Sequence, residues 1–305
     1  MAGVINTGSH PKLLWPGIHA VWGQMYNQHP TEYTDLFDVL SSQKAYEQDV
    51  QVTGFGLAPV KGQGQSIQYD SEMQGWITTY AHVAYALGYI VTKEELDDNL
   101  YKEVSTRRAK ANAFSMTQTI ENVAAFIYNN AFNNTYYAMP DGKAIIATDH
   151  LNPSGGTFSN KLTPGADLSE AALEDICIQI MNATQDRGLR ISVMPRSLHI
   201  PTQEWFNANR ILKSVLQSDT GNNAINVLKA TNAFPEGIKL NHYFTNPNAW
   251  FIRTNIPNGP QFFWRSKPVF DQDNDFDTKN AKAASYMRFS AGITDARGLY
   301  GSEGP

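Results

Sequence analysis

The segment between Gly88 and Pro140 constrains the fold of this chain more than any other, because it contains neither glycine nor proline. Thr92 followed by Glu95 is the pattern of a capping box, which marks a helix start. Apolar residues then recur at helical spacing: Leu96, Leu100, Val104, Ala111, Phe114, Ile120, Val123, Ala124, Ile127 and Ala131. The pattern predicts one helix over 93–131, about 58 Å long. Because an average globular helix has only about 11 residues, such a rod indicates a flat, extended subunit.

A glycine-rich segment precedes the predicted rod, VTGFGLAPVKGQGQSIQYD at residues 52–70. Apolar and polar residues alternate on both sides of the glycines, over 50–53 and over 67–70, which predicts a β-hairpin with a pliable tip. Gly54-Phe55-Gly56 is not a dinucleotide fingerprint, because Pro59 stands at the place of the third glycine. Residues 62–66 lack the lysine of a phosphate-binding loop. We therefore interpret the segment as a flexible hairpin.

The rest of the chain predicts a mixed α+β fold. Residues 1–45 carry aromatic residues with little periodicity, His10, Trp15, Trp22, Tyr26, Tyr33 and Phe37 among them, so we expect an arm that lies along another surface. The other expected elements are a strand over 83–91, a loop over 151–166, a helix from Asp167 that Gly188 ends, a strand over 189–193, a helix from Pro201 with Val215 and Leu216 inward, turns at 246–248 and 257–259, and strands over 262–293.

The composition and motifs give no indication of a catalytic or ligand-binding site. The net charge of −5, without a basic stripe, argues against a dedicated nucleic-acid binder. No signal peptide or membrane span is apparent, and the single Cys177 sits on an apolar helix face, as a structural thiol does. We interpret Asp149-His150 as a turn or cap. The histidines are dispersed along the chain, at His10, His19, His29, His82, His150, His199 and His242. We therefore expect no catalytic, cofactor-binding or metal-binding residues.

Four aspartates alternate near the C-terminus: Asp271, Asp273, Asp275 and Asp277. On a strand they would share one face. The glycine of a calcium loop is replaced by Phe276, and position twelve of that frame is Lys282. We interpret this acidic strip as a solvated or interface-facing surface that meets Lys or Arg, with cation binding as the alternative.

The order of these parts resembles a major capsid protein of tailed bacteriophages, most closely the Mu-like major head subunit group. The segments that carry the resemblance are ATDHLNPSGGTFSNKL at 147–162, residues 167–201, LNHYFTNPNAWFIRTNIPNG at 240–259, and residues 273–302. The resemblance implies the Hong Kong 97-type (Johnson) capsid fold. Its parts would be an N-terminal arm (1–50), an extended E-loop with its flanking strand (51–91), a peripheral domain with the spine helix (92–165 and 262–305), and an axial domain (166–261).

The same resemblance implies a function. The chain would assemble as hexamers and pentamers into the icosahedral shell that encloses phage double-stranded DNA, without cofactors or enzymatic activity. Separate scaffold, portal and decoration proteins would be its partners, with assembly in the host bacterial cytoplasm. Lys61 lies where the best-known member cross-links its subunits, but a solvated or ion-paired lysine is our interpretation. The alternatives are an encapsulin-like compartment and a soluble enzyme centred on 166–261.

Overall fold

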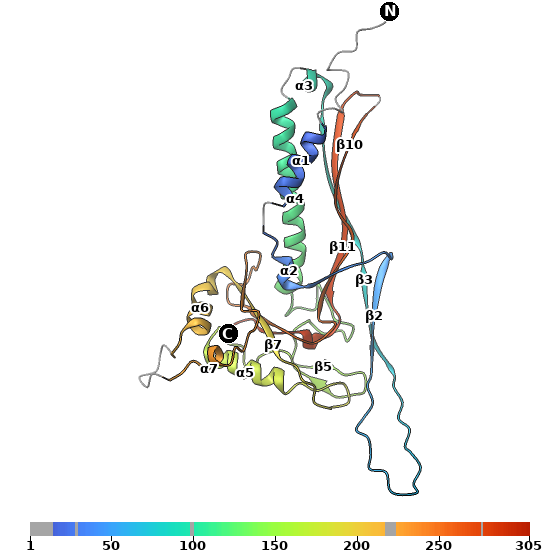
Figure 1. Cartoon of the computed structure of the whole chain (residues 1–305), viewed down its shortest axis with the longest axis vertical. Helices are drawn as coiled ribbons and strands as arrows, with labels where there is room; N and C mark the ends of the chain where they lie inside the picture. Colours follow the sequence, from blue (N-terminus) through green and yellow to red (C-terminus); the bar gives the residue numbers. More distant parts are fainter. Residues whose placement is uncertain (1–14, 28–29, 98–100, 217–223, 276) are drawn as a thin grey trace, which may run out of the picture.

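The computed structural model describes residues 15–27, 30–97, 101–216, 224–275 and 277–305. The subunit is elongated: a tall blade of helix and sheet stands on a compact lobe, and a narrow arm extends below both (Figure 1). The helices are α1 (Trp15–Tyr26), α2 (Tyr33–Leu36), α3 (Lys93–Asp97), α4 (Tyr101–Asn129), α5 (Glu170–Met181), α6 (Trp205–Lys213) and α7 (Val227–Ala230), with 3-10 turns η3 (Thr202–Glu204) and η4 (Ala296–Gly298). The strands are β1 (Asp38–Ser41), β2 (Tyr46–Val52), β3 (Gln74–Ala81), β4 (Val83–Val91), β5 (His150–Leu151), β6 (Thr157–Phe158), β7 (Pro195–Pro201), β8 (Ile238–Asn241), β9 (Trp250–Thr254), β10 (Pro260–Asn274), β11 (Ala281–Ile293) and β12 (Leu299–Ser302).

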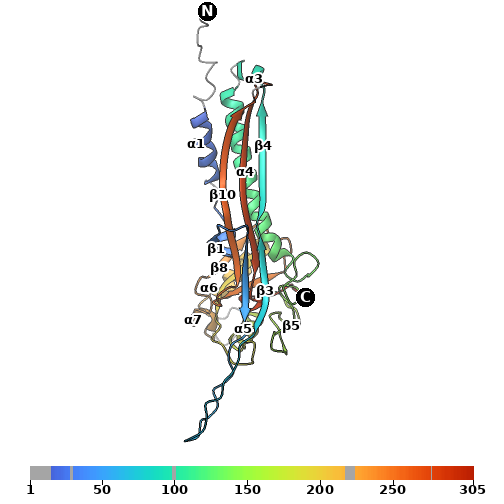
Figure 2. The ribbon, with the colours of Figure 1, turned by 90° about the vertical axis from the view of Figure 1, so that its right-hand side faces the viewer.

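The blade is a four-stranded sheet in the order β1-β10-β11-β4, covered on one face by α4 and α1. The strands are antiparallel except for β1, which runs parallel to β10. Figure 2 shows the long β10–β11 hairpin in front of α4. Small residues such as Ala109, Ala113 and Ala124 on the buried face of α4 let the helix approach the sheet, where Met287 and Phe289 are buried. The alternations that predicted strands over 83–91 and 262–293 are confirmed.

The lobe is a second four-stranded sheet, β12-β9-β7-β8, with α5 packed against it. Its strands β7 and β9 are buried almost throughout, as expected of central strands. Leu173 and Ile176 of α5 lie in one apolar core with Leu198 of β7 and Ile252 of β9. The lobe and the blade are therefore two cores, and β12 at the C-terminal end of the chain returns to complete the lobe.

The N-terminal aromatic residues pack on their own subunit. Trp22 is stacked between Tyr26 and Phe270, with ring centroids 5.2 and 5.5 Å apart, and its indole N–H donates to Asn112 Oδ1 at 2.9 Å. Phe37 is buried against Tyr128 of α4. The expectation that these aromatics need another surface is therefore wrong from Trp22 onward, because α4 and β10 offer an apolar groove. His10 lies outside the described residues, as does the side chain of Trp15.

The predicted single rod over 93–131 is two helices. Glu95 of α3 forms an ion pair with Arg108 of α4 through two contacts, at 3.0 and 3.1 Å. Thirteen residues of one straight helix would separate them by about 20 Å, so α3 folds back beside α4. Thr92 does cap α3, since its hydroxyl accepts from the N–H of Glu95 at 3.4 Å. Residues 98–100, with the periodic Leu100, lie outside the described part. The remaining rod, α4, is about 43 Å long.

Several boundaries in the lobe differ from the sequence expectations. Helix α5 begins after Ser169, whose hydroxyl accepts from the N–H of Ala172, rather than at Asp167. It ends at Met181, so Gly188 (φ 79°) belongs to a later tight turn, and the predicted strand over 189–193 is absent from this fully described segment. The predicted loop over 151–166 contains three of the four residues of the small β5–β6 hairpin, all but His150.

Side-chain orientation also differs at the helix ends of the lobe. A helix does begin after Pro201, but Val215 and Leu216 follow the end of α6 and are exposed rather than inward. Met181, at the last position of α5, is exposed as well. The prediction from helical periodicity therefore makes both helices a few residues too long. None of the helices in the described part has the length and apolar character needed to cross a membrane.

Candidate functional site

The most exposed apolar surface of the subunit is the loop between β2 and β3, residues 53–73. Its side chains are almost fully in solvent at the tip: Leu57 is 81% exposed, Tyr69 93% and Val60 98%. The loop extends beyond the lobe, away from the rest of the chain (Figure 1). A soluble subunit rarely keeps such apolar residues in water unless a partner covers them. We call residues 57–69 the loop tip.

The loop begins as a β-hairpin and then loses its ladder. β2 and β3 pair from Tyr46–Ala81 to Val52–Gln74, with a bulge near the end. Two more hydrogen bonds join Thr53 to Met73. The Thr53 N–H donates to the Met73 carbonyl at 2.9 Å, and the Met73 N–H donates to the Thr53 hydroxyl at 2.8 Å. The predicted strand over 67–70 is therefore wrong, and pairing resumes only at residue 74. The glycine-rich tip keeps the two limbs extended but unpaired.

Below the ladder, a polar neck closes the loop. The Asp70 carboxylate accepts from the backbone N–H groups of Gly56 and Ser71, both at 2.8 Å, and from the Arg187 guanidinium at 2.7 Å. These hydrogen bonds, the one from Gly56 foremost, lower the pKa of Asp70 to about 2. Arg187 also donates to the carbonyl of Ser71, and Gln185 donates to that of Phe55 at 3.4 Å. We call these six residues the neck: Phe55, Gly56, Asp70, Ser71, Gln185 and Arg187.

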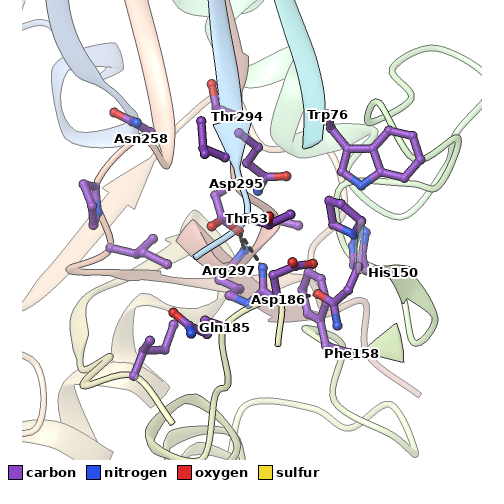
Figure 3. A pocket seen from close by; sticks show the side chains of 18 of the residues that line it. Thr53, Trp76, His150, Phe158, Gln185, Asp186, Asn258, Thr294, Asp295 and Arg297 are labelled. Atoms are coloured by element: carbon purple, nitrogen blue, oxygen red, sulfur yellow. Dashed lines mark hydrogen bonds and ion pairs between the residues drawn. The ribbon is translucent and has the colours of Figure 1, made fainter. Parts of the chain in front are cut away.

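A cavity of about 450 Å³ lies between the loop root and the body. Figure 3 shows Thr53 and Trp76 from the β2–β3 pair facing Asp186, Arg297 and His150 from the body. The Trp76 indole N–H donates to the carbonyl of Leu151 at 3.3 Å, which ties β3 to the β5–β6 hairpin. The cavity therefore sits where the loop arm joins the subunit, rather than within either core.

Polar side chains that line this cavity have partners within the chain. His150 Nδ1 lies 2.7 Å from Asp141, and both side chains are buried. Arg297 lies 3.8 Å from the centre of the Phe158 ring and donates to Asn152 Oδ1 at 2.6 Å. His150 thus pairs with Asp141, whereas its sequence neighbour Asp149 pairs with Lys143. These contacts brace the loop root, a role that a turn or cap at Asp149-His150 does not predict.

The acidic strip divides between strand and turn. Asp271 and Asp273 are exposed on one face of β10, as alternation predicts. Asp275 follows the strand and forms an ion pair with Lys282 of β11 at 2.8 Å, which confirms the expected meeting with a lysine. That hydrogen bond, followed by one from the Asp277 N–H, lowers the pKa of Asp275.

The other residues singled out from the sequence lie apart. Lys61 is exposed at the loop tip. Cys177 lies in the core of the lobe, as its place on an apolar helix face predicts, and burial raises the pKa of its thiol to about 11. His10 and His29 fall outside the described residues. Within the described ranges, no cluster of three or more His, Cys, Asp or Glu side chains could hold a metal ion.

Comparison with known proteins places the chain in a family. The sequence model of a family described as phage capsid protein matches residues 76–302, well over half of the 305 residues. No curated protein sequence matches the chain at a significant level.

Solved structures share the fold at low sequence identity. The capsid of Myoviridae phage XM1 has a TM-score of 0.52 at 10% identity and covers 100% of both chains. The capsid of cyanophage P-SCSP1u has a TM-score of 0.54 at 12% identity, over 89% of this chain and 87% of that chain. A virus-like particle from Pyrococcus furiosus has a TM-score of 0.54 at 12% identity, over 94% and 98%.

The narrower assignment to a Mu-like group stays a prediction, since the family match does not reach that level. The chain belongs to the phage capsid protein family, as a tailed-phage major capsid protein with the Hong Kong 97-type fold and a structural component of the virion shell.

Proposed function

We propose that this chain assembles as hexamers and pentamers into an icosahedral shell around double-stranded DNA, and that it has no enzymatic activity. The loop tip carries the proposal: it presents large apolar side chains to solvent on an otherwise folded subunit. A neighbouring copy that covered the tip would remove this apolar surface from water, at about 25 cal/mol per Å². Many modest contacts of this kind, repeated by symmetry, would hold a closed shell together.

We further propose that the parts divide the labour as the sequence resemblance implies. Residues 1–50 form an N-terminal arm, 51–91 the E-loop with its strand, 92–165 and 262–305 the peripheral domain, and 166–261 the axial domain whose loops meet at the symmetry axes. The separate apolar cores of blade and lobe support this division. In the described structure β12, from the C-terminal segment, pairs with β9 and so ties the two domains together.

Scaffold, portal and decoration proteins are proposed as separate partners, and the host bacterial cytoplasm as the place of assembly. Contacts to packaged DNA would be few and local, because the net charge is −5. Particles purified from the producing host distinguish the phage shell from a cargo compartment: nuclease-protected DNA supports the first, whereas packaged protein without DNA supports an encapsulin-like function.

Removal of the loop tip tests the assembly function. The Gly56 N–H donates to the Asp70 carboxylate at 2.8 Å, so the two limbs lie close together here and a short Gly-Ser linker can replace residues 57–69. We expect the shortened chain to keep the melting temperature of the wild type but to form no closed shells in negative-stain electron microscopy. The control Lys61→Gln keeps the length and apolar surface of the tip and should form normal shells. Normal shells from the shortened chain would refute the role of the tip.

Electrophoresis tests the covalent alternative at Lys61. We interpret this exposed lysine as solvated, so mature particles should give only monomer bands under denaturing conditions. A ladder of oligomers that disappears in Lys61→Gln would instead establish cross-linking through this side chain.

A further inference from the structure

We infer that Arg187 is the positioning residue of the assembly loop: its contacts at the neck set the direction in which the tip leaves its own subunit. The inference rests on the proposed function for the use of the loop, but the positioning itself is a property of the single chain. Arg187 lies in the tight turn 185–188 of the lobe, 117 residues away in sequence from Asp70.

Arg187 holds the returning limb of the loop with two separate nitrogens. Nη1 donates to Asp70 Oδ2 at 2.7 Å, and Nη2 donates to the carbonyl of Ser71 at 2.5 Å. Two parallel contacts fix direction as well as distance, which a single contact does not. A lysine would keep the charge but could not reproduce the planar fork.

The outgoing limb is held through the same carboxylate. Asp70 Oδ2, the atom that binds Arg187, also accepts from the N–H of Gly56 at 2.8 Å. Gln185, two residues before Arg187, donates to the carbonyl of Phe55 at 3.4 Å. One turn of the lobe therefore contacts both limbs, and Asp70 joins them to each other.

Local packing leaves room for this arrangement. A Cβ at Gly54 would lie 3.3 Å from Gln185 Oε1, which is a tight contact, whereas one at Gly56 would lie 3.5 Å from Asp70 Oδ2, which is an ordinary one. Gly54 thus lets the backbone approach the Gln185 side chain closely. This gives Gly54 a use distinct from the pliability of the tip.

Small rotations at the neck produce large displacements at the tip. The limb of roughly six residues over 57–62 spans about 20 Å at about 3.3 Å per residue. A rotation of about 20° at the neck therefore moves the tip by about 7 Å, more than a side-chain length. Because the side chains of Arg187 and Asp70 are 22% and 45% exposed, added salt screens the attraction between them.

Distance measurements between spin labels test the positioning on the unassembled subunit. One label replaces Lys61 at the tip and the other replaces Asp175, an exposed residue of α5, in a Cys177→Ala background. We expect the wild-type neck to give one narrow distance distribution. Arg187→Gln and Asp70→Asn should broaden it at least twofold, and Arg187→Lys should broaden it as well, since the fork is lost.

Arg190→Gln is the matched control. Arg190 lies just beyond the same turn and donates to Asn182 Oδ1 at 3.0 Å within the lobe, where it binds no loop residue. Its substitution should leave the distribution as narrow as in the wild type, and circular dichroism should show an unchanged fold for every variant. A distribution equally narrow in Arg187→Gln would overturn the inference.

Particle counts separate this inference from the proposed function. If Arg187 positions the loop for assembly, Arg187→Gln should lower the yield of closed shells at least tenfold, with Arg190→Gln unaffected. A broadened distribution with an unchanged yield would overturn the role of positioning in assembly. Failure of the wild-type chain to form shells would count against the proposed function instead, while the distance comparison would still decide whether Arg187 positions the loop.

Discussion

Substitution of Glu121 by glutamine should remove a pH dependence from the stability of the subunit. Glu121 lies on α4 with its side chain 1% exposed, and its two oxygens accept from the backbone N–H groups of Glu32 and Tyr33 at 3.0 and 2.9 Å. The carboxyl group thus satisfies the free N–H groups at the start of α2 and fastens the N-terminal segment to α4. Burial, and secondarily the nearby Glu32 charge, raise the pKa of Glu121 to about 7.

The sign and the magnitude of the pH dependence of stability follow from this raised pKa. The ordinary pKa of 4.5 applies to the unfolded chain, so between pH 4.5 and about 7 the folded state binds more protons than the unfolded state. The contribution of Glu121 to the unfolding free energy therefore falls as pH rises through this window and is constant above it. At about 1.36 kcal/mol per pH unit the loss is about 3 kcal/mol. Glutamine cannot ionise, so the variant should not show this loss.

Denaturant unfolding of the unassembled subunit at pH 5, 6, 7 and 8, followed by tryptophan fluorescence, measures the effect. The difference in unfolding free energy between Glu121→Gln and the wild type should change by about 3 kcal/mol across this series, in favour of the variant at high pH. Glu94→Gln, which removes an exposed carboxylate from α3, should run parallel to the wild type. Parallel profiles for Glu121→Gln and the wild type would refute the reasoning.

Substitutions at three further residues test other contacts by the same unfolding assay. Trp22→Ala should lower the unfolding free energy by about 3–5 kcal/mol even in the unassembled subunit, because Trp22 is buried on its own chain. An unchanged unfolding free energy would show that another subunit buries Trp22. Tyr128→Phe should cost about 1–3 kcal/mol, because the hydroxyl donates to the buried carbonyl of Leu36 at 2.6 Å and phenylalanine leaves that carbonyl unpaired; an unchanged midpoint would contradict this bond. Ser169→Ala should cost about 1 kcal/mol as a lost helix cap, whereas Ser169→Asp should not.

Much of the blade could be predicted because its signals are local. The absence of glycine and proline after Gly88 predicts the long helix, and strict alternation predicts β4 and the β10–β11 hairpin. The fold-back of α3 was missed because periodicity continues through it. The Glu95–Arg108 ion pair holds α3 beside α4. Its two residues are 13 positions apart, and residues at that spacing are not neighbours within one helix.

The functional contacts depend on long-range pairing, which the sequence does not display. Arg187 follows α5 without any motif, and only the fold brings it to Asp70. The N-terminal aromatic residues predict burial but not the surface that buries them. In the structure, α4 and β10 form that surface. At α5, Asp167 and Ser169 are both acceptable caps, and the tertiary fold selects Ser169.

Hydrogen exchange of the loop tip tests the central claim most directly, since it asks whether a second copy covers residues 57–69. Mass spectrometry of pepsin peptides compares the unassembled subunit with purified particles under identical conditions. We predict rapid exchange over 57–69 in the subunit and exchange at least tenfold slower in particles, with α4 protected in both. Equally rapid exchange of the tip in intact particles would contradict the claim that copies of this chain cover the loop that it leaves exposed.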